Sequence, residues 1–96
     1  MVRLNWTEQA ANDLKNIFEY ISKDSKIYAK QHIERIRSKT ILLRANPYIG
    51  RKVPEFNDKN IREILFGNFR IIYKISNEET IDILTVFHAS RILKLI

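Results

Sequence analysis

Residues 61–75 read IREILFGNFRIIYKI, and this stretch decides the fold class. β-Branched and aromatic residues dominate it, and Gly67-Asn68 divides it in the way that a tight turn divides two strands. A third run of the same kind, residues 80–88, follows a polar segment. The C-terminal half therefore predicts an antiparallel three-strand meander with strands at 61–66, 69–75 and 80–88.

The middle strand of this meander has two different faces. One face is apolar and consists of Phe69, Ile71, Tyr73 and Ile75, whereas the other consists of Arg70, Ile72 and Lys74. Because side chains alternate along a strand, we expect the apolar face to pack on helices. The second face is expected to be basic and partly exposed, and we look for functional residues there.

A short strand and two helices are expected before the meander. Residues 2–6 alternate apolar and polar side chains, and Thr7 ahead of Glu8 supplies a helix N-cap. The first helix is predicted over about 8–22, and the second runs to about 45, where Asn46-Pro47 ends it. Each helix has an expected apolar stripe: Ala11, Leu14, Ile17, Phe18 and Ile21 on the first, and Tyr28, Ala29, Ile33, Ile36, Thr40 and Leu43 on the second.

Two segments lack such a pattern. Residues 48–60 contain Gly50, Pro54 and mixed charge, which favours a long loop over a strand or helix. Residues 89–96 are compatible with a short helix, but their apolar side chains would be exposed unless something covers them. The chain is thus predicted to be a single α+β domain over residues 1–96, in which the first strand joins the sheet.

The composition excludes several classes of site. The chain has no cysteine, so a disulfide, a thiolate metal site and a cysteine nucleophile are all ruled out. Its glycines, Gly50 and Gly67, form no phosphate-binding loop, and His32 and His88 lack a nearby acid cluster. No apolar run approaches the roughly 20 residues of a membrane span, and the N-terminus has no secretory pattern. A cytoplasmic protein without metal or cofactor is expected.

The charge is strongly basic. Seventeen Lys and Arg against eleven Asp and Glu give +6, and the isoelectric point is near 9.8. This balance favours an anionic partner such as nucleic acid or an acidic protein. However, a net charge of about 2 to 8 is ordinary for a small soluble domain, so charge alone does not identify a partner.

The amino-acid sequence of the predicted meander resembles that of the RelE/ParE toxin superfamily. The resemblance is carried by residues 61–67, 69–74 and 86–91, which include REILFGNFRIIYKI and the downstream FHASR. It covers nearly the whole chain, because the first strand, the helical hairpin and the NPYIGRKVPE loop precede the meander in the family's order. Within the superfamily, the sequence is closer to the ParE-like branch, whose members are often called plasmid stabilisation proteins. The resemblance implies a type II toxin held inactive by a cognate antitoxin in a hetero-oligomer.

The resemblance leaves two targets open. ParE-like toxins poison DNA gyrase by binding, whereas RelE-like toxins are metal-independent endoribonucleases that cleave mRNA on the ribosome. RelE-like ribonucleases often use a tyrosine near the C-terminus, but this chain reads ASRILKLI after His88. This difference favours the ParE-like branch, with the mRNA interferase as the alternative. A general nucleic-acid-binding module is disfavoured, because exposed aromatics do not interleave with the basic residues.

The ribonuclease alternative assigns the chemistry to Arg70, His88 and Arg91. His88 would transfer protons, and the arginines would steady the charge that grows on the phosphate. In either branch we expect target contacts from Arg51, Lys52, Arg62 and Lys74.

Each of these residues also has an ordinary structural interpretation. Arg62 and Lys74 fit solvated faces, and His88 fits a structural hydrogen-bonding role at a strand end. His32, beside Ile33 on the second helix, is expected to be a packing residue.

Overall fold

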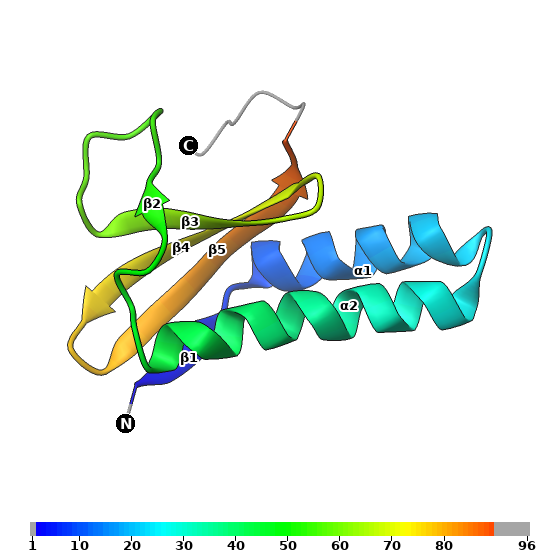
Figure 1. The fold of residues 1–96 in the computed structure, drawn as a ribbon, viewed down its shortest axis with the longest axis horizontal. Helices are drawn as coiled ribbons and strands as arrows, with labels where there is room; N and C mark the ends of the chain where they lie inside the picture. The colour runs from blue at the N-terminus through cyan, green and yellow to red at the C-terminus, as the bar shows by residue number, and fades with distance from the viewer. Residues whose placement is uncertain (1, 90–96) are drawn as a thin grey trace.

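A five-stranded sheet with a helical hairpin against one face makes up the molecule (Figure 1). The computed structural model describes residues 2–89, and the placement of every element refers to that range. In chain order the elements are β1 Arg3–Trp6, α1 Glu8–Ser22, α2 Lys26–Ile41, the 3-10 turn η1 Leu42–Arg44, β2 Arg51–Lys52, β3 Ile61–Phe66, β4 Phe69–Asn77 and β5 Thr80–His88. The predicted α+β fold is confirmed.

The strand order is β1-β5-β4-β3-β2, so the chain's first strand lies beside its last described strand. β3, β4 and β5 form the predicted antiparallel meander. β1 joins it in parallel with β5, in a register that places Arg3 opposite Thr80 and Trp6 opposite Ile83. The two helices lie side by side and antiparallel in Figure 1.

Polar side chains fix where the helices begin. The Thr7 hydroxyl accepts a hydrogen bond from the Ala10 N–H at 3.1 Å, which satisfies a backbone donor of the first turn of α1. The same hydroxyl donates to the Ile83 carbonyl oxygen at 2.8 Å, which ties the start of α1 to β5. Ser25 caps α2 in the same way, by accepting from the Tyr28 N–H at 3.1 Å.

The core lies between the helices and the apolar face of the sheet. Its fully or nearly buried members are Ala10, Leu14, Ile36, Leu43, Ile71, Tyr73, Ile75, Ile81, Ile83 and Val86. Tyr73 also fixes the path of the chain after α2, because its hydroxyl donates to the Pro47 carbonyl oxygen and accepts from the Gly50 N–H. A Cβ at position 50 would lie 2.6 Å from that hydroxyl oxygen, so only glycine allows this approach.

The structure corrects the predicted fold in its details. The segment 48–60 was expected to contain no strand, yet Arg51–Lys52 pairs with β3 as β2, a strand too short to show alternation. On α1 the buried alanine is Ala10 rather than Ala11, and Phe18 remains 36% exposed. The buried stripe of α1 therefore runs through Ala10, Leu14 and Ile17, and it is narrower than predicted. Tyr28 on α2, also expected to be buried, is 53% exposed.

Candidate functional site

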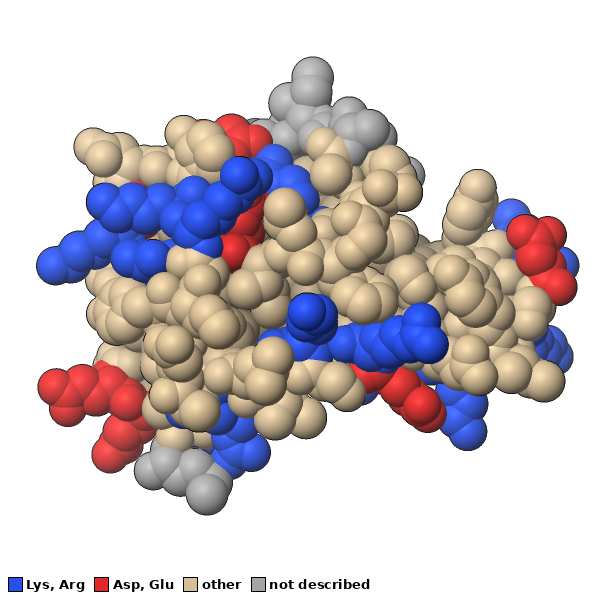
Figure 2. Space-filling model, in the orientation of Figure 1, with Lys and Arg blue, Asp and Glu red and all other residues tan. Residues whose placement is uncertain are grey.

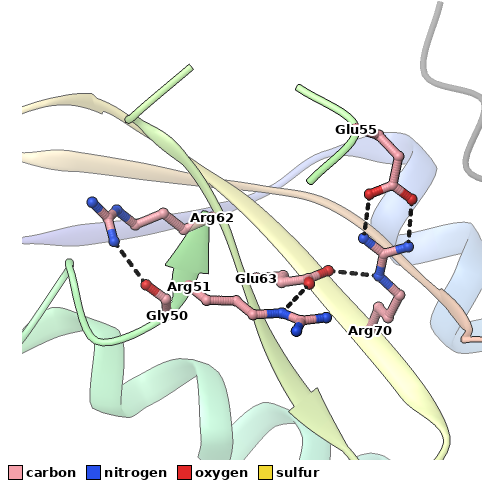
Figure 3. Close-up of polar contacts among 6 residues, drawn as sticks. All are labelled: Gly50, Arg51, Glu55, Arg62, Glu63 and Arg70. Atoms are coloured by element: carbon pink, nitrogen blue, oxygen red, sulfur yellow. Dashed lines mark hydrogen bonds and ion pairs between the residues drawn. The ribbon is translucent and has the colours of Figure 1, made fainter. Parts of the chain in front are cut away.

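The sheet face that points away from the helices carries a compact set of charges, shown in Figure 3. We call it the outer-face ion cluster and define it as Arg51, Glu55, Glu63 and Arg70. The Glu63 side chain is completely buried, and it accepts from Arg51 Nε at 2.5 Å and from Arg70 Nε at 2.6 Å. Arg70 Nη1 and Nη2 each donate to one oxygen of Glu55, at 2.8 and 2.9 Å. The cluster thus joins β2, β3, β4 and the loop after β2.

Strand pairing explains why these charges meet. β3 and β4 pair so that Leu65 lies opposite Arg70 and Glu63 lies opposite Ile72, which makes Glu63 and Arg70 diagonal neighbours on one face. β2 pairs so that Arg51 lies directly opposite Glu63. Glu63 is therefore flanked by an arginine on either side, and a buried carboxylate is tolerated only when it is paired in this way.

The ion pairs of Arg70 attach the loop after β2 to the sheet. The hydrogen bonds from Arg70 hold the pKa of Glu55 at about 2, well below its usual value, and Glu55 and Glu63 in turn raise the pKa of Arg70. A two-pronged guanidinium–carboxylate contact is among the stronger side-chain interactions in proteins. Each nitrogen of Arg70 thus already donates to a carboxylate, and two anions surround this cation.

The outer face is less exposed than the sequence predicted. Arg70 is only 8% exposed and Ile72 is fully buried, whereas Lys74 alone of the three predicted residues lies open to solvent. Phe87 of β5 adds to this burial, because the Arg70 guanidinium carbon lies 5.2 Å from the centre of its ring. The expectation of a partly exposed basic face is therefore wrong at Arg70 and Ile72.

The exposed positive charge gathers at the β2–β3 side of the molecule, which Figure 2 shows as a group of blue side chains. We call Arg51, Lys52 and Arg62 the basic edge. Arg62 is held by the Gly50 and Lys59 carbonyl oxygens and stacks on the Tyr48 ring at 4.9 Å. The Arg51 side chain is 61% exposed although its Nε is paired. Lys52 is exposed as well.

His88 lies on the opposite face from Arg70. It stands opposite Phe69 in the β4–β5 register, and their rings pack edge to face with centroids 5.6 Å apart. It lines a cavity of about 600 Å³ together with α1 residues that include Asp13 and Tyr20. The structure therefore brings Arg51 and Arg70 together on Glu63 and pairs Lys52 with Arg62 beside them, whereas His88 lies on the opposite face from Arg70. Arg91 lies outside the described residues, as does the predicted short helix of the tail.

Asp13 has a role that the sequence did not reveal. It is not part of the predicted apolar stripe of α1, yet one of its carboxylate oxygens accepts from the Thr85 hydroxyl at 2.5 Å and from the Val86 N–H at 3.0 Å. β1 pairs with β5 only as far as Ile83, so Asp13 satisfies the β5 backbone just beyond that point. Only the packing of α1 against β5 shows this contact.

The two acids of the ion cluster were also missed. Glu63 could have been found, since a two-residue turn at Gly67-Asn68 makes it a diagonal neighbour of Arg70 on the same face of the predicted hairpin. Glu55 could not, because its partner depends on the path of an irregular loop.

No metal site is found among residues 2–89, where no group of three or more His, Cys, Asp and Glu side chains is placed to hold an ion. None of the helices in that range combines the length and the apolar character needed to cross a membrane.

Two solved structures have the same fold. A chain of the chromosomal ParDE toxin–antitoxin system from P. aeruginosa superposes with a TM-score of 0.77 at 22% identity, covering 94% of this chain and 98% of that one. A chain of the RelBE2 toxin–antitoxin complex from Mycobacterium tuberculosis gives 0.64 at 20% identity, covering 91% and 96%. The domain is thus a RelE/ParE fold. No curated protein sequence matches the chain.

The family model of the ParE toxin of type II toxin–antitoxin systems, parDE, matches residues 4–93. The chain therefore belongs to the ParE toxin family, as the sequence of its meander predicted.

Proposed function

We propose that this toxin stops bacterial growth in the cytoplasm by binding DNA gyrase, and that a cognate antitoxin neutralises it. The observation that carries the proposal is the state of Arg70. Two carboxylates already pair with the charge of Arg70, which uses three of its five N–H donors and is only 8% exposed, so it is poorly placed to hold a phosphate in a transition state. Within the ion cluster two arginines balance two glutamates, so the cluster offers no net positive charge.

The position of His88 supports the same conclusion. General acid–base catalysis needs the proton-transferring group within hydrogen-bond reach of the reacting atoms. His88 lies on the helix-facing side of β5, whereas the arginines of the ion cluster lie on the other face. A single scissile phosphate would have to be reached from both faces of the sheet. Binding to a protein target requires no such convergence.

The basic edge is the observation that favours the alternative, a RelE-like ribonuclease acting on ribosome-bound mRNA. Arg51, Lys52 and Arg62 present positive charge that fits a phosphate backbone. The same charge also fits an acidic surface of a protein target, which charge complementarity would steer into place. The two functions therefore differ in chemistry rather than in the surface that they use.

The purified toxin should be tested in parallel for inhibition of gyrase supercoiling and for cleavage of mRNA during translation. We expect inhibited supercoiling and intact mRNA. The matched variants are Lys52→Ala on the basic edge and Lys15→Ala, an exposed lysine on the helix α1; only the first should weaken inhibition. Cleaved mRNA with normal supercoiling would refute the proposal and establish the alternative.

The antitoxin part of the proposal is tested in cells. Induced alone, the toxin should arrest growth, and co-expression of the protein encoded by the adjacent gene should restore it. Normal growth at high soluble expression of the toxin would contradict its assignment as an active toxin.

A further inference from the structure

The helix α2 carries most of the net charge of the chain. It has five basic side chains and one acid, Glu34, whereas α1 has three acids and one lysine. The chain as a whole has a net charge of +6. A surface that is merely soluble usually mixes charges of both signs. The separation of charge between the two helices therefore indicates a surface of one sign on α2.

Four basic residues share one flank of this helix. Lys26, Lys30, Arg37 and Arg44 follow one another at intervals of four, seven and seven residues, so helical geometry places them in one narrow sector along α2 and η1. We call them the α2 basic stripe. All four side chains are exposed, and the buried residues of α2 lie on another side of the helix. At 1.5 Å per residue the stripe is about 27 Å long.

Contacts with β1 and the residue before it orient the two arginines of the stripe. The Arg37 guanidinium carbon lies 5.5 Å from the centre of the Trp6 ring, and Arg44 Nε donates to the Val2 carbonyl oxygen at 2.9 Å. The stripe therefore faces the β1 side of the molecule. Because the guanidinium groups are already oriented, they lose less conformational entropy when an anion binds.

Neighbouring acids do not neutralise the lysines of the stripe. Among residues 2–89, no salt bridge reaches Lys26, Lys30 or Arg37, whereas Arg70 of the ion cluster pairs with two glutamates. Lys26 also occupies the first position of α2, and the first turn has no acid. A positive side chain at that position disfavours the helix, because the N-terminal end of the helix dipole is itself positive. The protein thus concentrates positive charge here at some cost in stability.

The backbone of a nucleic-acid duplex is the partner that best fits such a stripe. It presents a regular row of negative charge, roughly one charge per 1.7 Å of duplex axis. A single strand would instead need exposed aromatic side chains on which its bases stack. Trp6 beside the stripe already contacts Arg37, and Tyr28 lies on the opposite flank of α2, beside His32.

The stripe and the basic edge lie on opposite sides of the sheet. The strand order β1-β5-β4-β3-β2 puts β1, beside the stripe, at one margin and β2, with the basic edge, at the other. A single contact surface would have to reach around the domain to cover both. A protein that holds duplex DNA supplies a separate partner for each region.

We propose that the α2 basic stripe binds the phosphate backbone of duplex DNA, so that the toxin contacts both gyrase and the DNA beside it. The inference rests on the proposed binding to gyrase and adds a second partner, the DNA on which that enzyme acts. Each residue of the stripe contacts phosphate and reads no base sequence. Four such contacts make the binding weak, independent of sequence and strongly dependent on salt.

Fluorescence anisotropy with the intact toxin and a short labelled DNA duplex tests the contact directly. Lys30→Glu should weaken binding about tenfold at low salt, and the slope of log K against log salt, about 3 to 4 in magnitude for the wild type, should fall by about one. Lys15→Glu is the matched control, because it changes an exposed lysine of α1 and gives the same net charge. It should bind DNA nearly as the wild type does. Both variants place a good helix former at an exposed helical position, so circular dichroism should show unchanged folding.

Two outcomes of this experiment would overturn the inference. Equal losses in Lys30→Glu and Lys15→Glu would mean that net charge, rather than the stripe, explains the binding. Tighter binding to an RNA duplex of the same sequence would mean that the partner is RNA.

A second measurement distinguishes this inference from the proposed function. Lys30→Glu should inhibit supercoiling less than the wild type does, yet it should bind gyrase equally well when DNA is absent. Lys52→Ala should weaken binding to gyrase under the same conditions. Undiminished inhibition by Lys30→Glu would overturn the contact with DNA beside gyrase. A wild-type toxin that leaves supercoiling unaffected would instead refute the proposed function, while the anisotropy result would still decide whether the stripe binds DNA.

Discussion

Both faces of the central strand β4 are buried, but different interactions bury them. On the helix-facing side Ile71 and Tyr73 pack against α1 and α2 in a largely apolar core. On the other side Arg70 and its acid partners hold the loop after β2 against the sheet. Apolar burial tolerates small changes, whereas a buried charge is costly as soon as its partner is lost. The sheet therefore depends on solvent conditions mainly through its outer face.

The largest effect should follow from removing Arg70. In Arg70→Ala, Glu63 stays buried with only Arg51 as partner, and we expect the free energy of unfolding to fall by about 3 to 5 kcal/mol. Urea unfolding followed by circular dichroism measures this loss.

The control for Arg70 replaces both buried partners. The double variant Glu63→Leu/Arg70→Met keeps the volume and removes the buried charges, so it should recover most of the lost stability. If the double variant were as unstable as Arg70→Ala, the charges would not be the cause of the loss.

A smaller effect is expected on the helix-facing side at His32. Its ring lies among Tyr28, Phe66 and Phe69, and its buried Nε2 has no hydrogen-bond partner among residues 2–89. Burial, with Arg35 nearby, lowers the pKa of His32 below 6.5. The unfolded chain then binds more protons than the folded one just below pH 6.5, so stability should decrease as the pH falls through that range.

His32→Phe checks this assignment, because phenylalanine fits the same aromatic surroundings and does not titrate. At pH 7.5 it should change the free energy of unfolding by no more than about 1.5 kcal/mol. Between pH 7 and 5 the variant should have a flatter stability profile than the wild type. Identical slopes in the two proteins would place the titrating group elsewhere.

The smallest effect should come from Glu55, the more exposed of the two acids in the ion cluster. Its side chain is 40% exposed, so Glu55→Gln should cost no more than about 1 kcal/mol at neutral pH. Because the pKa of Glu55 is lowered to about 2, its contribution should be present above pH 4.5 and disappear as the pH falls toward 2. Acid titrations of wild type and Glu55→Gln should therefore converge at low pH, and a constant difference would contradict the pairing.

Most helices and strands could be predicted from the sequence, because turns, strand alternation and helix caps depend on neighbouring residues. The turn at Gly67, the period-two strands and the Thr7 cap can each be read from a few neighbouring residues. The short strand β2 could not be predicted, since only the long-range contact between Tyr73 and Gly50 puts Arg51 beside β3.

The same distinction applies to the candidate site. From the sequence, Arg70 was expected to contact a phosphate in the ribonuclease alternative. Its partner Glu55 could not be identified, because Glu55 lies in an irregular loop 15 residues away. It also grouped His88 with Arg70, whereas the strand register places the two on opposite faces. Residues suited to catalysis or binding can be recognised in a sequence, but strand register decides on which face of the sheet each side chain lies.

The pairing of β1 with β5 has a consequence for biosynthesis. Residues 3–6 are synthesised well before residues 80–83, with which they pair. Contacts of such long sequence separation form late and slow the folding of a small domain. β1 can join the sheet only after residues 80–83 have been made, so a chain that ends before them lacks this edge of the sheet.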